Sequence, residues 1–274
     1  MKKIYLVVLY KTQYSDSQTL RVFSELCFGK NEDNFFVIWD NSPTSKATLS
    51  NLKVFLKTEN VAYIHTPENT ALSKVYNFCL DTYSDFEVLV IFDQDTKVAR
   101  ADFDAYLEDV ISENSDINIF LPKIYSKSKL YSPGKFWVFK GWHYENLSAG
   151  IHKDRFYTAI MSGTCARIDF LKRHNIRFNE NLALYGIDTC FFCDVRKIDS
   201  RFYVLDEKPE HSLSENTLND FERETRRQHY IMACKKIARK NYFYLILIFL
   251  YEFFLRIAKC FISQRNHPRR HKTL

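Results

Sequence analysis

The first 121 residues alternate between short, continuous apolar runs and longer stretches in which apolar residues recur every three or four positions. The continuous runs predict strands buried on both faces, and the periodic stretches predict helices with one buried face. Ser15 or Asp16 is the expected N-cap of the first helix. The predicted strands are 4–9, 35–39, 62–65, 88–92 and 117–121, and the predicted helices are 16–28, 47–58, 70–82 and 101–113.

This alternation predicts an α/β fold, with a Rossmann-like, mostly parallel open sheet and helices on both of its faces. Ligands of such sheets bind outside the carboxyl ends of the strands. Polar residues follow those ends here, so we expect a ligand crevice at that edge. The loops concerned are 10–11, 40–42, 66–69 and 93–95.

The pattern changes after residue 122. Residues 123–160 are rich in Lys, Tyr, Ser and Trp without a clear period, which predicts irregular or antiparallel structure with a hairpin. Residues 169–174 predict a helix, 189–197 a helix or turn, and 202–205 a late strand. A length of 274 residues suits one large domain with an appendage.

The composition excludes several kinds of site. With 6 glycines and neither G-x-G-x-x-G nor G-x-x-x-x-G-K, the chain lacks the common glycine-rich phosphate loops. Cys190 and Cys193 form a C-x-x-C, but no second C-x-x-C completes a zinc site, so buried thiols in a reducing cytoplasm are expected. The N-terminal apolar run is too short for a signal peptide and is expected to be the first strand.

Two carboxylates, Asp93 and Asp95, directly follow the predicted strand 88–92. Like charges at this spacing repel each other unless a cation or water separates them. A divalent cation between them would neutralise the repulsion and could itself hold a diphosphate. The alternative interpretation is a well-solvated polar turn.

A resemblance to a known family rests on short motifs that occur in the family's order. Between residues 4 and 215 the chain resembles the inverting glycosyltransferases of family 2, in their rhamnosyltransferase-like and galactofuranosyltransferase-like branch. The resemblance implies a GT-A catalytic domain over residues 1–215, a UDP- or dTDP-sugar donor, and Mn²⁺ or Mg²⁺ as cofactor. The motifs are VVLYK (7–11), VIWDNSP (37–43), ENTALSKVYNFCL (68–80), VIFDQDT (90–96), MSGTCAR (161–167), FNENLALYGIDTCFFCDVR (178–196) and PEHSL (209–213).

The resemblance also implies roles for individual residues. Asp188 would be the general base that deprotonates the acceptor hydroxyl, although a helix N-cap is the alternative for this residue. His211 would join Asp93 and Asp95 at the metal or contact the diphosphate, and a surface histidine is its alternative. The residues expected at the donor nucleotide are Tyr10, Asp40, Asn41, Asn69, Ser73 and Asp93.

This sequence departs from the family pattern at four positions, where Thr70, Phe78 and Ser214 replace expected glycines and Ile187 replaces an expected acid. These departures keep a catalytically inactive, membrane-peripheral binding protein of the same fold as an alternative. A nucleotidyltransferase is a second alternative, but its first loop is usually rich in glycine and lysine.

The C-terminal segment, 216–274, is expected to be helical, basic and membrane-associating. Its uninterrupted apolar run, Tyr242–Tyr251, has 10 residues, which is short of a membrane span. Glu252, Arg256 and Lys259 fall on one helical face, which predicts a helix that lies in the membrane interface with its charges outward. Packing on the catalytic domain or in a homodimer interface is the alternative, and nucleic acid is not an expected partner.

Together these features predict a transferase at the inner face of the cell membrane. Its expected partners are a nucleotide-sugar donor and a lipid-linked oligosaccharide acceptor, in the synthesis of a bacterial surface polysaccharide such as O-antigen or capsule. The basic residues around the apolar run favour an anionic cytoplasmic leaflet.

Overall fold

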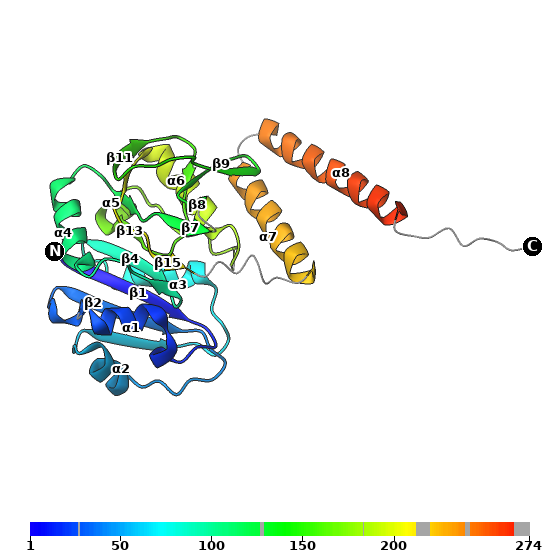
Figure 1. The fold of residues 1–274 in the computed structure, drawn as a ribbon. Coiled ribbons are helices and arrows are strands. Elements are labelled where there is room, and N and C mark those ends of the chain that lie inside the picture. Colours follow the sequence, from blue (N-terminus) through cyan, green and yellow to red (C-terminus); the bar gives the residue numbers. More distant parts are fainter. Residues whose placement is uncertain (27, 127–128, 183, 212–219, 239–241, 266–274) are drawn as a thin grey trace, which may run out of the picture.

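The structure of the protein is a computed structural model that describes residues 1–26, 28–126, 129–182, 184–211, 220–238 and 242–265 (Figure 1). Its helices are α1 (Gln18–Glu25), α2 (Leu49–Leu56), α3 (Leu72–Thr82), α4 (Phe103–Glu113), α5 (Ile168–Arg173), α6 (Ile187–Ile198), α7 (Asp220–Ala238) and α8 (Tyr242–Arg265). Its strands are β1 (Lys3–Leu9), β2 (Asn34–Asp40), β3 (Val61–His65), β4 (Val88–Asp93), β5 (Thr96–Lys97), β6 (Ile119–Leu121), β7 (Ile124–Ser126), β8 (Lys129–Ser132), β9 (Gly134–Trp137), β10 (Lys140–His143), β11 (Gly150–Lys153), β12 (Tyr157–Thr158), β13 (Thr164–Arg167), β14 (Arg201–Val204) and β15 (Glu210–His211).

An eight-stranded sheet in the order β11-β14-β6-β13-β4-β1-β2-β3 forms the body of the molecule. The predicted parallel arrangement is confirmed for β1, β2, β3 and β4. Beyond β4 the sheet is mixed, because β13 runs antiparallel to both β4 and β6. Strand β11 also pairs antiparallel with β14 at the outer edge.

The helices predicted before residue 122 are all present, and their boundaries differ by a few residues. The first helix is capped by Ser17, whose side chain accepts a hydrogen bond from the Leu20 amide, so the expected cap at Ser15 or Asp16 is wrong. Alternate residues of β1 enter two apolar clusters on opposite faces of the sheet. Tyr5 and Val7 pack with α1, α2 and α4, whereas Ile4 and Leu6 pack with α3, α5 and α6.

The expected irregular region, 123–160, contains short antiparallel strands. β7 and β8 form a hairpin, and β9 pairs with both β10 and β12 in a small three-stranded sheet. The expected hairpin is therefore present. The short strands β8 and β9 lie near α6 (Figure 1), and residues of β8, β9, β10 and β12 line a cavity of about 600 Å³.

The two C-terminal helices pack in sequence on the body, with α7 against α6 and α8 against α7 (Figure 1). One apolar cluster contains residues of β9, α6, α7 and α8, so the C-terminal segment is joined to the predicted catalytic domain. The predicted boundary at 215/216 lies outside the described residues. Within the described part of the chain, no helix has the length and apolarity that crossing a membrane requires.

The side of α8 that carries Glu252 packs on α7, and contact of α8 with a membrane stays a prediction. The Glu252 carboxylate lies 2.8 Å from Lys235 Nζ of α7. The ring of Tyr251 stacks on Phe139 with centroids 4.6 Å apart. The charged Glu252 therefore faces the protein, and the opposite face of α8 presents large apolar side chains to the outside.

Candidate active site

The first group of candidate residues lies on the turn between β4 and β5. Asp93 is the last residue of β4, and Gln94 and Asp95 form the turn that leads to Thr96. The Asp93 amide donates to Ser162 Oγ (3.0 Å), and the Thr96 amide donates to Thr19 Oγ1 (3.1 Å). Asp93 and Asp95 are half-buried. Neighbouring hydroxyl groups therefore hold the backbone on both sides of the paired carboxylates.

Gln94, between the two aspartates, connects this turn to the end of β1. Its Oε1 accepts from the Tyr10 amide (2.7 Å), and its Nε2 donates to the Tyr10 carbonyl (3.2 Å). The next amide, that of Lys11, donates to Ser42 Oγ (2.8 Å) after β2. The ends of three strands are joined in this way, and Tyr10 remains 40% exposed.

Asp40 ends β2 and lines a cavity of about 340 Å³ between the loops that follow β1 and β2. Its carboxylate accepts from the Ser42 amide (2.9 Å) and from the Tyr63 hydroxyl (3.0 Å). Burial alone would raise the pKa of Asp40, but hydrogen bonds from Ser42, Ser45 and Tyr63 outweigh it and lower the pKa. Asp40 is thus a buried, ionised group at one wall of this cavity.

The side chain of Asn41 holds neighbouring loops together. Its Oδ1 accepts from Trp39 Nε1 (3.1 Å) and Thr66 Oγ1 (2.6 Å), and its Nδ2 donates to the Thr70 carbonyl (2.9 Å). Asn69 lies exposed in the same loop with a φ of 56°. Asn tolerates this left-handed conformation better than most residues do. The predicted nucleotide contacts of Asn41 and Asn69 stay predictions.

Ser73 requires a correction. It was expected near the nucleotide, but the residue is completely buried, and its hydroxyl donates to the Leu182 carbonyl (2.7 Å). Asn77, one turn further along α3, exchanges two hydrogen bonds with the backbone of Phe178. Ser73 and Asn77 therefore fasten α3 to the loop that leads to α6, which explains their presence without a ligand.

Asp188 lies in the first turn of α6, where Gly186 with a φ of 82° is the N-cap, so the alternative of Asp188 as N-cap is wrong. The Met161 amide and the amide of Asp188 itself hydrogen-bond to the carboxylate. Burial, followed by the negative charge of Asp93, nevertheless raises the pKa of Asp188 to about 7. A carboxyl group with a pKa near the operating pH suits a general base.

Asp93 and Asp188 lie close enough for the charge of Asp93 to raise the pKa of Asp188. Burial, and then the charges of both aspartates, also raises the pKa of the Tyr76 phenol. The structure thus brings together two candidate groups that are 95 positions apart in the sequence.

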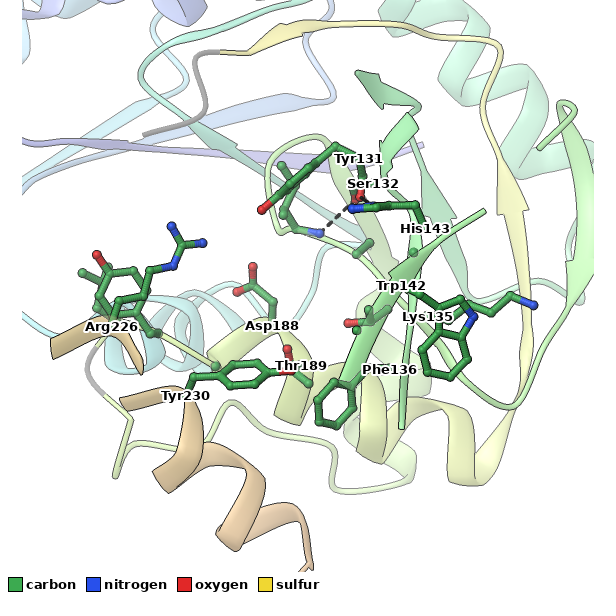
Figure 2. A pocket seen from close by; sticks show the side chains of 18 of the residues that line it. Tyr131, Ser132, Lys135, Phe136, Trp142, His143, Asp188, Thr189, Arg226 and Tyr230 are labelled. Atoms are coloured by element: carbon green, nitrogen blue, oxygen red, sulfur yellow. Dashed lines mark hydrogen bonds between the residues drawn. The ribbon is translucent and has the colours of Figure 1, made fainter. Parts of the chain in front are cut away.

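The carboxylate of Asp188 points into a cavity of about 600 Å³ (Figure 2). Tyr131 and Arg226 lie on either side of this carboxylate, and Tyr230 lies near it (Figure 2). Arg226 and Tyr230 belong to α7, which the sequence analysis did not connect to the site. The aromatic residues that line this cavity are Tyr131, Phe136, Trp142, Tyr185 and Tyr230.

The backbone of His211 lies in β15, opposite Thr96 of β5. Thr96 directly follows Asp95 in the chain, so the backbone of His211 runs next to the Asp93–Asp95 turn. Its side chain lies outside the described part of the structure. Among the described side chains, no group of three or more His, Cys, Asp or Glu is placed to hold a metal ion. By residue type, two aspartates and a histidine would be a donor set that suits Mn²⁺ or Mg²⁺.

The C-x-x-C motif is buried, as expected. Cys190 and Cys193 lie in α6 as free thiols, and burial raises the pKa of Cys190 to about 12. The pKa of Cys193 is also raised by burial. Such thiols are neither reactive nor good metal ligands at neutral pH.

No family model matches the sequence, and a search of curated proteins found no match. Solved structures do match it. S. aureus TarS is 17% identical, with a TM-score of 0.57 over 88% of this chain and 39% of that chain. GalNAc-T7 with UDP, GalNAc and Mn²⁺ is 12% identical, with a TM-score of 0.58 over 77% of this chain and 44% of that chain.

The chain has the GT-A glycosyltransferase fold. The first 349 residues of S. aureus TarS in complex with UDP-GlcNAc match with 15% identity and a TM-score of 0.57, over 87% of this chain and 66% of that chain. The chain thus spans about two fifths of the longer TarS and GalNAc-T7 chains. Neither name specifies the rhamnosyl or galactofuranosyl branch, which stays a prediction.

Proposed function

We propose that the protein is an inverting glycosyltransferase that moves a sugar from a nucleotide-diphosphate donor to a hydroxyl group of an acceptor glycan. The observation that carries this proposal is the juxtaposition of the Asp93–Asp95 turn with Asp188 at one crevice of a GT-A fold. The structural neighbours TarS and GalNAc-T7 are described with UDP-GlcNAc and with UDP, GalNAc and Mn²⁺, which supports a UDP-sugar as donor.

The donor would lie along the carboxyl ends of β1, β2 and β4. Its nucleoside would occupy the side of Tyr10, Asp40 and Asn41, and its diphosphate would lie towards Asp93 and Asp95. A divalent cation held by Asp93, Asp95 and His211 would supply charge neutralisation for the departing nucleoside diphosphate. The preorganised turn keeps the two carboxylates in place before the donor arrives.

The acceptor would enter the cavity in front of Asp188. There the carboxylate removes the proton of the acceptor hydroxyl as its oxygen bonds to the anomeric carbon. The bond from that carbon to the diphosphate oxygen breaks on the opposite side, so the anomeric configuration inverts. The proton remains on Asp188 until solvent accepts it, and the aromatic wall of the cavity suits a sugar ring.

The finer assignments belong to this proposal as well. A rhamnosyl- or galactofuranosyltransferase-like activity on a lipid-linked oligosaccharide, in the synthesis of a bacterial surface polysaccharide, fits the sequence motifs. The outward apolar face of α8 supports work at the inner face of the cell membrane.

The decisive variant for this function is Asp188→Asn. It should lower the transfer rate by at least about a thousandfold, because a side chain that cannot accept the proton leaves the hydroxyl a poor nucleophile. Binding of the nucleoside diphosphate should stay within about twofold. Equal loss of transfer and nucleotide binding would contradict the assignment of Asp188 as base.

A further inference from the structure

A second large cavity lies beside another face of α6. It measures about 690 Å³, and we call it the lateral cavity. Its α6 wall consists of Cys190, Cys193, Asp194, Arg196 and Lys197. Residues 137–138, 155–156 and 179, the end of α7 and the first turn of α8 complete the wall, so the lateral cavity lies between the predicted catalytic domain and the C-terminal helices.

The lateral cavity is basic. Arg155, Arg196, Lys197 and Lys236 line it, against the single carboxylate of Asp194. Lys197 pairs with that carboxylate at 2.6 Å. Arg196 donates to the Tyr157 carbonyl (2.8 Å) and Lys236 to the Asn181 carbonyl (3.1 Å). Carbonyl oxygens are neutral, so these bonds orient the two side chains and leave their positive charge to attract an anion.

An aromatic pair connects the lateral cavity to α8. Trp137 Nε1 donates to the Tyr244 hydroxyl (3.4 Å), and the two rings meet edge to face with centroids 6.1 Å apart. Both residues line the lateral cavity. Indole and phenol rings have an apolar body and a polar edge, which is the combination found where a protein enters a membrane interface.

The outward face of α8 begins beside this aromatic pair. Its large apolar side chains recur at helical spacing, and Phe243, Phe249 and Phe254 are 61%, 56% and 63% exposed. We call this set the α8 apolar face. A monomeric soluble protein rarely leaves so long an apolar stripe in water. The members of the face are Tyr242, Phe243, Ile246, Phe249, Leu250, Phe253, Phe254 and Ile257.

We propose that the lateral cavity binds the phosphate headgroup of an anionic phospholipid while the α8 apolar face inserts into the same bilayer. The proposal extends the membrane association in the proposed function and does not depend on the transfer chemistry. Charge favours a membrane over a second copy of the chain, because two copies would bring their basic cavities together and repel. Docking through α8 would also fix the Asp188 cavity relative to the bilayer, since α7 lines that cavity and packs on α8.

Vesicle co-sedimentation of the full chain tests the proposal, with phosphatidylcholine vesicles that contain or lack phosphatidylglycerol. Removing two positive charges with Arg155→Gln and Lys236→Gln should weaken binding to the anionic vesicles by about tenfold or more. The matched control is Lys172→Gln with Arg173→Gln, which removes the same charge from the exposed side of α5 and should leave binding unchanged.

Phe249→Asp with Phe253→Asp should abolish binding to both kinds of vesicle. Val54→Asp is its control, because Val54 is 80% exposed on α2 and far from α8 in sequence. Circular dichroism and thermal unfolding like those of the wild type verify that every variant is folded. A wild-type protein that binds vesicles but no nucleoside diphosphate would refute the transferase and leave the docking site standing.

Three results would overturn the docking site. If the Arg155/Lys236 variant bound anionic vesicles as tightly as the wild type, the headgroup cavity would be refuted. If the Phe249/Phe253 variant bound vesicles as tightly as the wild type, insertion of α8 would be refuted. A dimer in analytical ultracentrifugation that dissociates in the Phe249/Phe253 variant, without vesicle binding by the wild type, would show that a second copy covers α8.

Discussion

The two sides of the crevice are built in different ways. On the proposed donor side, hydrogen bonds between adjacent strand ends hold the loops, as in the pairs Tyr10–Gln94 and Lys11–Ser42. On the proposed acceptor side, the walls come from 131–143, 158–160, 184–189 and α7, which only tertiary packing brings together. The donor side therefore depends on the sheet itself, whereas the acceptor side depends on how the C-terminal half packs against it.

Gly186→Ala should have the largest effect on the proposed acceptor side while sparing the proposed donor side. A Cβ at this position would lie 2.3 Å from the Cβ of Ala233 in α7, and its φ of 82° is unfavourable for other residues. Strain and overpacking together should cost about 2–5 kcal/mol of unfolding free energy, and α7 should shift away from Asp188. Sugar transfer should fall about a hundredfold, whereas nucleotide binding should fall far less.

Gly150→Ala is the control for this prediction. Gly150 has a φ of 118° but nothing within 4 Å of an added Cβ, so its substitution adds strain without a clash. Denaturant unfolding and transfer assays on both variants separate the two effects. Equal losses of transfer in both variants would contradict the role of the Gly186–Ala233 contact.

The raised pKa of Asp188 predicts a second large effect. Its folded pKa of about 7 lies above the ordinary value of 3.8, so folding favours the protonated form. This contribution to stability is present below about pH 4 and is lost as the pH rises through about 7. Asp188→Asn should therefore melt several degrees above the wild type at pH 8 and close to it at pH 4.

Thermal unfolding between pH 4 and 9 measures that difference, with Asp109→Asn on the exposed face of α4 as control. The transfer rate of the wild type should rise with pH and reach half its plateau near pH 7, since the unprotonated carboxylate is the active form. A constant difference in melting temperature across this range would show that Asp188 has an ordinary pKa.

Tyr131→Ala should affect the acceptor side alone. Tyr131 lies beside the Asp188 carboxylate in the cavity (Figure 2), so its loss should lower kcat/KM for the acceptor by about tenfold. The KM for the donor should stay unchanged. Tyr125→Ala is the matched control, because Tyr125 is exposed on the other strand of the same hairpin and does not line this cavity. If the KM for the donor changed more than kcat/KM for the acceptor, the placement of Tyr131 at the acceptor would be contradicted.

Gln94→Ala should give the smallest effect and act on the donor side. It removes both side-chain hydrogen bonds to the Tyr10 backbone, each worth about 1 kcal/mol. We expect a three- to tenfold weaker affinity for the nucleoside diphosphate in calorimetric titration. The acceptor KM should remain unchanged, and a shift in that constant would show that the two sides are not independent.

Local periodicity was sufficient to predict the first half of the fold. Continuous apolar runs located β1, β2 and β4, which are buried on both faces, and the partly exposed edge strand β3. Helical spacing located α1 to α4. The strand ends then predicted the position of Asp93 and Asp95. The mixed order around β13 could not be predicted, because the direction of a strand depends on long-range pairing that leaves no local pattern.

The candidate site was predicted less completely. Asp188 was found by resemblance, but its closeness to Asp93 depends on contacts across the whole fold. Gln94 and Ser162 were missed as positioning residues, although both lie inside quoted motifs, because polar residues in turns usually face water. Ser73 was placed wrongly because the sequence does not show that its hydroxyl turns towards Leu182.

The C-terminal helix adds a contact that the sequence does not reveal. The spacing of charges predicted one polar face on α8, and Lys235 of α7 binds Glu252 on that face, whereas large apolar side chains of α8 are exposed. Contact of this apolar face with a membrane stays a prediction.

The most direct test of the central claim is thermal stabilisation by UDP, dTDP, GDP and CDP, each with and without Mn²⁺. The wild type should be stabilised by UDP or dTDP, and only when Mn²⁺ is present. Asp95→Ala should lose this stabilisation, whereas Asp109→Ala, which removes an exposed carboxylate from α4, should keep it. Stabilisation by no diphosphate, or equal stabilisation of the Asp95 variant, would contradict the claim that the paired carboxylates hold a cation and a diphosphate.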